Sequence, residues 1–206
     1  YSLFQGGSAE RPSAQSLLLP TTFENLFLMP ASTALATLDR QLGAREGMGL
    51  VIGRALGQLR ERFSHVFIDC PPVLGVLMIN ALAASEHLLI PVQTEFLALK
   101  GLERMMRTLT MVTQARRIPL HHTIVPTMFD RRTRASLQAL KGLRERYPEE
   151  LWKSVIPVDT QFREASRQGL PLSALNPRAR GTIAYTALLN DLLGPDERIV
   201  QQAATQ

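Results

Sequence analysis

The sequence predicts an α/β fold in which a mostly parallel sheet is covered by helices on both faces. Short apolar runs alternate with longer amphipathic segments, and this alternation is typical of a parallel sheet with crossover helices. The hydrophobic share of 45% and the charged share of 20% are those of an ordinary globular chain. Because 206 residues suffice for one hydrophobic core, we expect a single domain over residues 1–206.

Composition also excludes several classes of protein. No apolar run approaches the roughly 18 residues that a membrane span requires, so no transmembrane segment is expected. The one cysteine, Cys70, cannot form an internal disulfide, which excludes a disulfide-stapled secreted scaffold and fits a reducing compartment. We therefore expect a cytoplasmic protein.

The first elements are predicted from apolar runs and their terminators. Residues 25–30 form a short apolar run stopped by Pro30, as a buried strand would be, and a short helix is expected over residues 34–42. Apolar residues at helical spacing predict an amphipathic helix over residues 47–63. The run at residues 65–69 predicts a strand that ends at Asp69, because two prolines follow Cys70.

The remaining elements continue the alternation. Helices are expected over residues 73–85, 97–115, 133–147 and 181–193, and strands over residues 87–92, 121–127 and 152–156. Residues 194–206 are expected to form a flexible tail. Parallel sheets bind ligands beyond the carboxyl ends of their strands, so the loops at these ends are the place to look for function.

Asp69 is the first candidate found at such a strand end. A carboxylate that directly follows a buried strand is held rigidly, where it can bind Mg²⁺, usually through water, opposite a nucleotide phosphate. The alternative is that Asp69 forms a turn or caps a helix, which is common for this residue. The surrounding sequence strengthens the first interpretation.

An ordered series of motifs surrounds Asp69 and continues to residue 181. The motifs are VFIDCPP at residues 66–72, NALAA at 80–84, LIPVQTEFLALKGL at 89–102, PTMFDRRT at 126–133, IPVD at 156–159, REAS at 163–166, GLP at 169–171 and RG at 180–181. The series resembles the ParA/MinD family of deviant P-loop ATPases (SIMIBI type) over roughly residues 20–193. It is most similar to the ParA-like proteins of flagellar and chemotaxis gene clusters.

One motif of that family is absent from the sequence. Family members begin with a strand, a glycine-rich phosphate loop of the KGGVGKT type and a helix, whereas the segment QGGS at residues 5–8 lacks the lysine. We therefore expect an amino-terminally truncated domain that lacks its first βα unit. By itself such a chain would bind ATP poorly and hydrolyse almost none, because the phosphate loop supplies most of the triphosphate contacts.

The resemblance implies roles for individual residues. Asp69 would be the catalytic residue, orienting a Mg²⁺-bound water, and Pro71 and Pro72 would shape the segment that senses the γ-phosphate. The adenine base would be flanked by Thr127, Met128, Pro157 and Val158. The alternatives are a strand-end cap for Asp69, a plain strand terminator for the two prolines, and edge packing for the other four.

Positive charge is concentrated in the second half of the chain. Residues 100–206 carry 17 Lys and Arg against 10 Asp and Glu, whereas residues 1–99 carry 6 against 8. Related partition ATPases hold DNA nonspecifically through basic patches, so we identify as candidate DNA-binding residues Arg131, Arg132, Arg134, Lys141 and Arg144. Three of them, Arg134, Lys141 and Arg144, fall within about 80° on a helix. A solvated helix face is the alternative.

The intact protein is thus expected to be a ParA-like ATPase that partitions chromosome or plasmid DNA, or positions chemotaxis or flagellar machinery. It would bind ATP and Mg²⁺, dimerise with ATP, and respond to a ParB-like or polar partner. The first alternative is a nucleotide-independent adaptor of the same fold. The second is a ligase or reductase of the fold, although one cysteine cannot ligate an iron–sulfur cluster and no feature indicates a ligase's second substrate.

Overall fold

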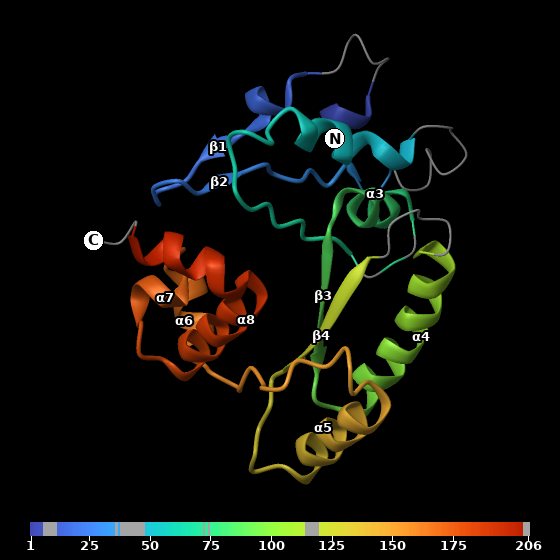
Figure 1. The fold of residues 1–206 in the computed structure, drawn as a ribbon, viewed down its shortest axis with the longest axis vertical. Helices are drawn as coiled ribbons and strands as arrows, with labels where there is room; N and C mark the ends of the chain where they lie inside the picture. The colour runs from blue at the N-terminus through green and yellow to red at the C-terminus, as the bar shows by residue number, and fades with distance from the viewer. Residues whose placement is uncertain are drawn as a thin grey trace. The chain divides into compact units, whose positions relative to one another are not determined.

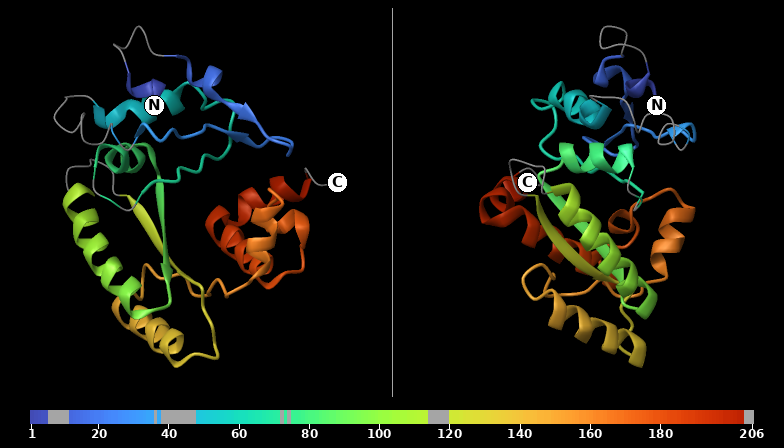
Figure 2. Two further views of the ribbon diagram at one scale, coloured as in Figure 1. Left: turned by 180° about the vertical axis from the view of Figure 1, so that it is seen from behind. Right: turned by 90° about the vertical axis from the view of Figure 1, so that its right-hand side faces the viewer.

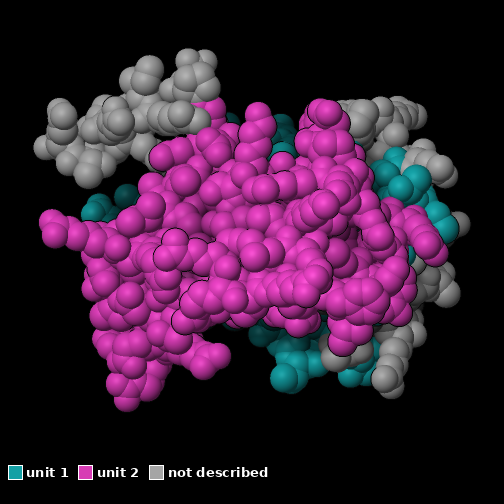
Figure 3. All heavy atoms as spheres, turned by 90° about the horizontal axis from the view of Figure 1, so that it is seen from below, with its two compact units in different colours: residues 1–88, 108–120 teal, residues 89–107, 121–206 magenta. Residues whose placement is uncertain are grey.

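The computed structural model describes residues 1–5, 12–35, 37, 48–71, 73, 75–113 and 120–203, without the side chains of Met48 and of residues 195–203 (Figure 1). The chain divides into two compact units (Figure 3). The first unit comprises Tyr1–Leu88 and Thr108–Leu120, and the second comprises Leu89–Arg107 and His121–Gln206. No described helix is long and apolar enough to cross a membrane.

The first unit is built from short elements. They are the 3-10 helices η1 (Ser2–Phe4), η2 (Ala14–Leu17) and η3 (Met48–Leu50), the strands β1 (Leu19–Pro20) and β2 (Phe27–Leu28), and the helices α2 (Val51–Gly57) and α3 (Val76–Ala84). Buried Asn80 joins the two α-helices, because its side chain donates to the Val76 carbonyl at 2.8 Å and accepts from the Ile52 amide at 3.1 Å. A fully buried amide is tolerated because both of its polar ends are paired.

Several predicted elements of the first unit differ from the structure. The strand expected at residues 25–30 is the two-residue β2, which pairs antiparallel with β1 and leaves Leu28 exposed. The helix expected over residues 47–63 ends as α2 at Gly57 and continues in turns. Most of the helix expected at residues 34–42 lies outside the described residues.

The strand expected at residues 65–69 is also not formed. The described part of this segment has no regular structure, and Val66 and Phe67 are 50% and 76% exposed. An apolar run becomes a strand only when a neighbour completes its hydrogen-bond ladder, and none of the described strands pairs with this one. The apolar pattern alone was therefore a misleading signal here.

The second unit holds the sheet and the longer helices. Its elements are β3 (His87–Gln93), α4 (Phe96–Thr113), β4 (His121–Thr127), α5 (Arg134–Arg146), α6 (Gln161–Arg167), α7 (Leu172–Leu175) and α8 (Arg180–Ala203), of which β3 and α4 extend beyond the unit. β3 and β4 are paired and run in the same direction, with α4 on one side and α8 on the other (Figures 1 and 2). The predicted strands and helices at β3, α4, β4, α5 and α8 are confirmed.

A hydrophobic cluster fixes α8 against β4. It contains the buried residues Val125, Trp152, Ile156 and Leu188. The indole nitrogen of Trp152 also donates to the carboxylate of Asp191 at 2.9 Å, so this buried side chain has its polar group paired. The segment expected as a strand at residues 152–156 is not a continuous strand, but it runs beside β4. The amides of Trp152 and Ile156 donate to the carbonyls of Ile124 and Pro126 at 2.9 and 2.8 Å, and isolated parallel bridges lie on either side of it, at Leu151 and Pro157.

Helix α8 begins at Arg180 and has one non-helical residue, Gly194, whose φ is +71°. Such a φ is accessible to glycine without steric cost. The expected flexible tail over residues 194–206 stays a prediction.

Candidate functional site

The loops after β3 and β4 and the segment at residues 157–159 meet at one edge of the second unit. The Phe129 amide donates to the Ile156 carbonyl at 3.1 Å, and the Val158 amide donates to the Phe129 carbonyl at 3.0 Å. Phe129 and Pro157 also form a parallel bridge. This pairing places Thr127 and Met128 beside Pro157 and Val158, so the structure brings together the four residues predicted to flank the base. We call this surface the carboxyl edge.

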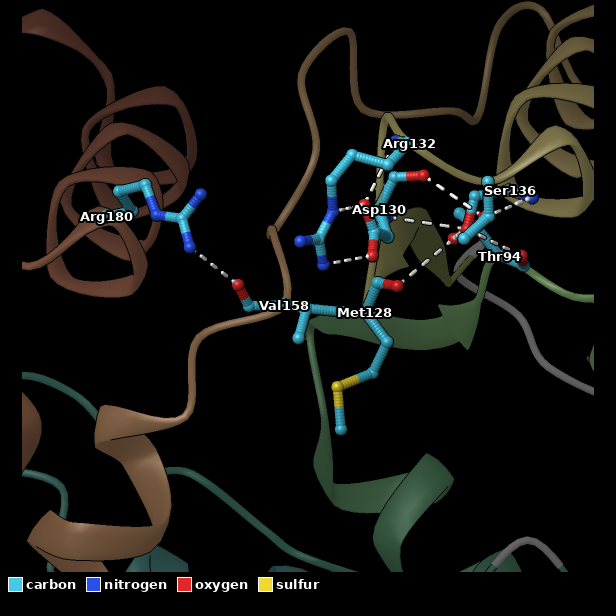
Figure 4. Close-up of polar contacts among 8 residues, drawn as sticks. Thr94, Met128, Asp130, Arg132, Ser136, Val158 and Arg180 are labelled. Carbon is cyan, nitrogen blue, oxygen red and sulfur yellow. Dashed lines mark hydrogen bonds and ion pairs between the residues drawn. The ribbon is translucent and has the colours of Figure 1, made fainter.

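Met128 has an unusual backbone conformation at the carboxyl edge. Its φ is +52°, in the left-handed region that residues other than glycine seldom adopt, and its side chain is exposed. Figure 4 shows the thioether extending away from the loop, while the Met128 carbonyl faces Thr94. The conformation therefore leaves a flexible apolar side chain uncovered next to Val158.

Asp130 organises the loop that follows Met128. Its carboxylate accepts two hydrogen bonds from the Arg132 guanidinium, at 2.9 and 2.8 Å, and a third from the Arg132 amide at 3.0 Å. These bonds lower the pKa of Asp130 to about 2, and those from the Arg132 side chain have the largest effect. Arg132, a predicted DNA-binding residue, thus has its guanidinium engaged within its own loop.

Asp159 and Arg180 join the carboxyl edge to the helices behind it. The Asp159 carboxylate accepts from the Gly181 amide and the Gln161 amide, both at 3.0 Å, so it caps α8 and α6 together. These bonds lower the pKa of Asp159, and the bond from the Gly181 amide has the largest effect. The Arg180 guanidinium donates to the Val158 carbonyl at 3.4 Å, as Figure 4 shows. The RG motif was a sequence signal for this contact, but its role was not predicted.

A pocket of about 270 Å³ opens beside Met128. It is lined by Gln93, Thr94, Glu95, Met128, Asp130, Thr133, Ala135 and Ser136. Thr94 and Ser136 are buried at its base, and sequence reasoning missed Ser136 altogether. The signal for Ser136 was its place three residues after Thr133, which caps α5 by accepting from the Ser136 amide at 3.3 Å.

Asp69 and Pro71 belong to the first unit and both are exposed. Among the described residues none donates a hydrogen bond to the Asp69 carboxylate, and the Mg²⁺-water role of Asp69 stays a prediction. Burial, followed by the charge of Asp69, raises the pKa of the neighbouring Cys70 thiol. Pro72, the remaining predicted nucleotide contact, lies outside the described residues.

The predicted DNA-binding residues lie on α5 and the loop before it, and all are exposed. Lys141 faces Glu145 at 3.7 Å one turn later, and Arg132 is paired with Asp130. Among the described residues, no ion pair involves Arg131, Arg134 or Arg144. These three therefore carry the uncompensated charge of the region.

The fold is of the α/β class with a parallel sheet, and comparison with known proteins identifies the family. Residues 2–122 match the family model described as an AAA domain. The chain is 33% identical over 177 residues to the sporulation initiation inhibitor protein Soj of Bacillus subtilis (strain 168), covering 85% of this chain and 70% of Soj. It is 30% identical over 189 residues to the chromosome-partitioning ATPase Soj of Treponema pallidum (strain Nichols), covering 91% and 75%. The chain belongs to the ParA/MinD family of P-loop ATPases.

Solved structures agree with this assignment. Cobyrinic acid a,c-diamide synthase from Mycobacterium smegmatis, solved with bound ADP and magnesium, matches with a TM-score of 0.69 and 31% identity. The match covers 84% of this chain, which spans 64% of the synthase. A variant of Cyanothece McdA, solved as its ATP complex, matches with a TM-score of 0.73 at 20% identity, covering 83% of this chain and 68% of McdA, and shows the fold alone. The predicted α/β fold with a parallel sheet is confirmed.

Proposed function

We propose that this chain works in a partition ATPase, which positions chromosome or plasmid DNA, or another cargo, through an ATP-dependent dimer. The observation that carries the proposal is the carboxyl edge, where Thr127, Met128, Pro157 and Val158 lie side by side in a family of nucleotide-binding proteins. The relatives named for chromosome partitioning support this function over the nucleotide-independent adaptor.

In this proposal the carboxyl edge binds the base. Met128 and Val158 would supply apolar contact to the flat ring, and Arg180 would place a guanidinium at the same edge. Asp69 would orient a water bound to Mg²⁺, which supplies charge neutralisation for the phosphates when it is present. Pro71 and Pro72 would shape the segment that follows Asp69.

The proposed partners are a second copy of the chain, a ParB-like or polar partner protein, and DNA held without base reading. The proposed location is the cytoplasm. The exposed and uncompensated Arg131, Arg134 and Arg144 support DNA contact, because nonspecific binding needs only phosphate neutralisation.

Calorimetric titration with ATP and Mg²⁺ tests the proposal. The 206-residue chain would be compared as wild type and as Met128→Ala. We expect the wild-type chain to bind ATP weakly and Met128→Ala to weaken that binding several-fold. Met111→Ala is the matched control, because Met111 is similarly exposed at 63% but lies on α4. Absence of ATP binding by the wild-type chain would overturn the ATPase proposal and favour the adaptor.

A further inference from the structure

Two buried hydroxyl groups meet beneath the carboxyl edge. Thr94 follows β3, Ser136 lies in the first turn of α5, and the two residues are 3% and 6% exposed. Their side-chain oxygens are 3.0 Å apart although 42 positions separate them in the sequence. The Ser136 hydroxyl is also placed to donate to the Thr94 carbonyl at 3.2 Å. Figure 4 shows the pair beside Asp130, close to the Met128 carbonyl.

This hydroxyl pair contacts the backbone of the loop after β4 at several points. The Thr94 hydroxyl lies 3.4 Å from the carbonyl oxygens of both Thr127 and Met128, and the Thr94 amide donates to Thr127 at 3.0 Å. The Asp130 amide donates to the Ser136 hydroxyl at 3.4 Å. Since a hydroxyl can donate once and accept twice, two of them can serve β3, the loop and α5 at the same time.

The loop requires such support because of Met128. A residue other than glycine remains in the left-handed region only where the surrounding structure holds it there. The hydroxyl pair contacts backbone groups on both sides of Met128, namely the carbonyl of Thr127 directly before it and the amide of Asp130 two residues after it. The exposed Met128 side chain makes no comparable anchor of its own.

We propose that the Thr94–Ser136 hydroxyl pair is the positioning element of the base-binding surface. The pair fixes the backbone conformation of Met128. It thereby also fixes the hydrogen bond between the Phe129 carbonyl and the Val158 amide. Both side chains are buried and their hydroxyls bond to the protein backbone, so we assign Thr94 and Ser136 as positioning residues. The inference deepens the proposed function and rests on it for the identity of the ligand, whereas the positioning itself can be measured without any ligand.

The test uses variants that remove or retain one hydroxyl. Thr94→Val and Ser136→Ala each remove a hydroxyl, while Thr94→Ser keeps it. The matched control is Thr182→Val, because Thr182 is also buried in the second unit and its hydroxyl donates to the Asn176 carbonyl at 2.9 Å. NMR hydrogen exchange follows the amides of Phe129 and Val158, whose own acceptors no substitution changes.

We expect Thr94→Val and Ser136→Ala to speed exchange at both amides by about tenfold, the effect of losing one buried hydrogen bond. Thr94→Ser should exchange like the wild type, and Thr182→Val should leave both amides unchanged. Wild-type exchange rates in the first two variants would overturn the inference, and so would an equal acceleration in Thr182→Val.

A second readout separates this inference from the proposed function. The labelled Met128 methyl group of the 206-residue chain is titrated with ATP and, separately, with inorganic tripolyphosphate. Thr94→Val should weaken the affinity for ATP several-fold and leave the affinity for tripolyphosphate unchanged, because the substitution disturbs only the surface proposed to bind the base. Equal weakening of both ligands would contradict positioning of the base surface. If wild-type Met128 does not respond to ATP, the proposed function fails while the exchange rates still decide the positioning.

Discussion

The carboxylate of Asp130 accepts hydrogen bonds from its own loop, and Arg132 donates them through its guanidinium and its amide. Its folded-state pKa of about 2 lies below the ordinary value of 3.8, so the charged form is favoured in the folded chain. Because the pKa of Asp130 is lower in the folded chain than in the unfolded chain, ionised Asp130 raises the free energy of unfolding. This contribution is fully present above pH 3.8 and is lost as the pH falls toward 2. The loop is therefore expected to keep this ion pair throughout the neutral and mildly acidic range.

Replacing Arg132 with Gln should raise the pKa of Asp130 toward 3.8, because the two guanidinium hydrogen bonds are lost. An NMR titration of the Asp130 carboxyl carbon measures the change. Arg131→Gln is the control, since Arg131 is adjacent and exposed but does not contribute to the shift. A pKa that stays near 2 in Arg132→Gln would show that another group holds the carboxylate.

Gly181 is required at the start of α8 for steric reasons. A Cβ at this position would lie 2.4 Å from Phe162 Cε2 and 2.5 Å from Cζ, and the Phe162 ring is itself packed edge-on against Tyr185. We expect Gly181→Ala to destabilise the second unit by roughly 1–3 kcal/mol, as overpacking does. Gly101→Ala, which meets no atom within 4 Å on α4, should instead stabilise by about 0.5–1 kcal/mol. Urea unfolding followed by Trp152 fluorescence measures both, and equal stabilities would refute the steric argument.

At the scale of elements, α5 begins where Thr133 caps it. The Thr133 hydroxyl accepts from the Ser136 amide and contacts the Asp130 carbonyl at 3.1 Å, so the cap also closes the preceding loop. Thr133→Ala should lower the free energy of unfolding by about 1 kcal/mol, and Thr133→Ser should restore most of it. The same fluorescence assay reports the change. Thr186→Ala, at an exposed position of α8, serves as control, and a loss there as large as at Thr133 would contradict the capping role.

The elements also show what the sequence could and could not predict. The sequence predicts a strand at residues 121–127, which are the bounds of β4. The strand forms there because its apolar run has a partner in β3. The run at residues 65–69 has the same pattern but no partner among the described strands, and it is not a strand. Helices α6 and α7 are too short for a helical period to be recognised.

The candidate site was predictable to the same extent. Prolines and polar residues at strand ends indicated the loops at residues 126–130 and 157–159, and the structure brings them together. The Thr94–Ser136 pair was not predictable, because two hydroxyl groups 42 positions apart meet only through the packing of α5 on the end of β3. Local pattern reveals which loops matter, whereas the contacts that hold them depend on tertiary structure.

For the molecule as a whole, charge is the feature that bears on a large partner. The net charge is +5, and the carboxyl-terminal half is the basic one. Ion pairs within the chain already engage Arg132 and Lys141, whereas Arg134 and Arg144 have none among the described residues. Arg134 and Arg144 should therefore contribute more to DNA contact than Lys141 does.

Changing Arg134, Lys141 and Arg144 together to Glu should abolish most binding to duplex DNA, because each basic residue that neutralises a phosphate releases counterions. Fluorescence anisotropy at several salt concentrations measures the affinity, and the slope of log affinity against log salt should fall by about one for each phosphate that the variant leaves unneutralised. The control makes the same charge change at exposed Arg104, Arg107 and Lys153, which are not part of α5. Unchanged duplex affinity in the α5 variant would rule out the basic stripe as a DNA surface, and equal loss in the control would mean that only net charge matters. A selective loss in the α5 variant would assign DNA contact to this helix, because both variants carry the same net charge.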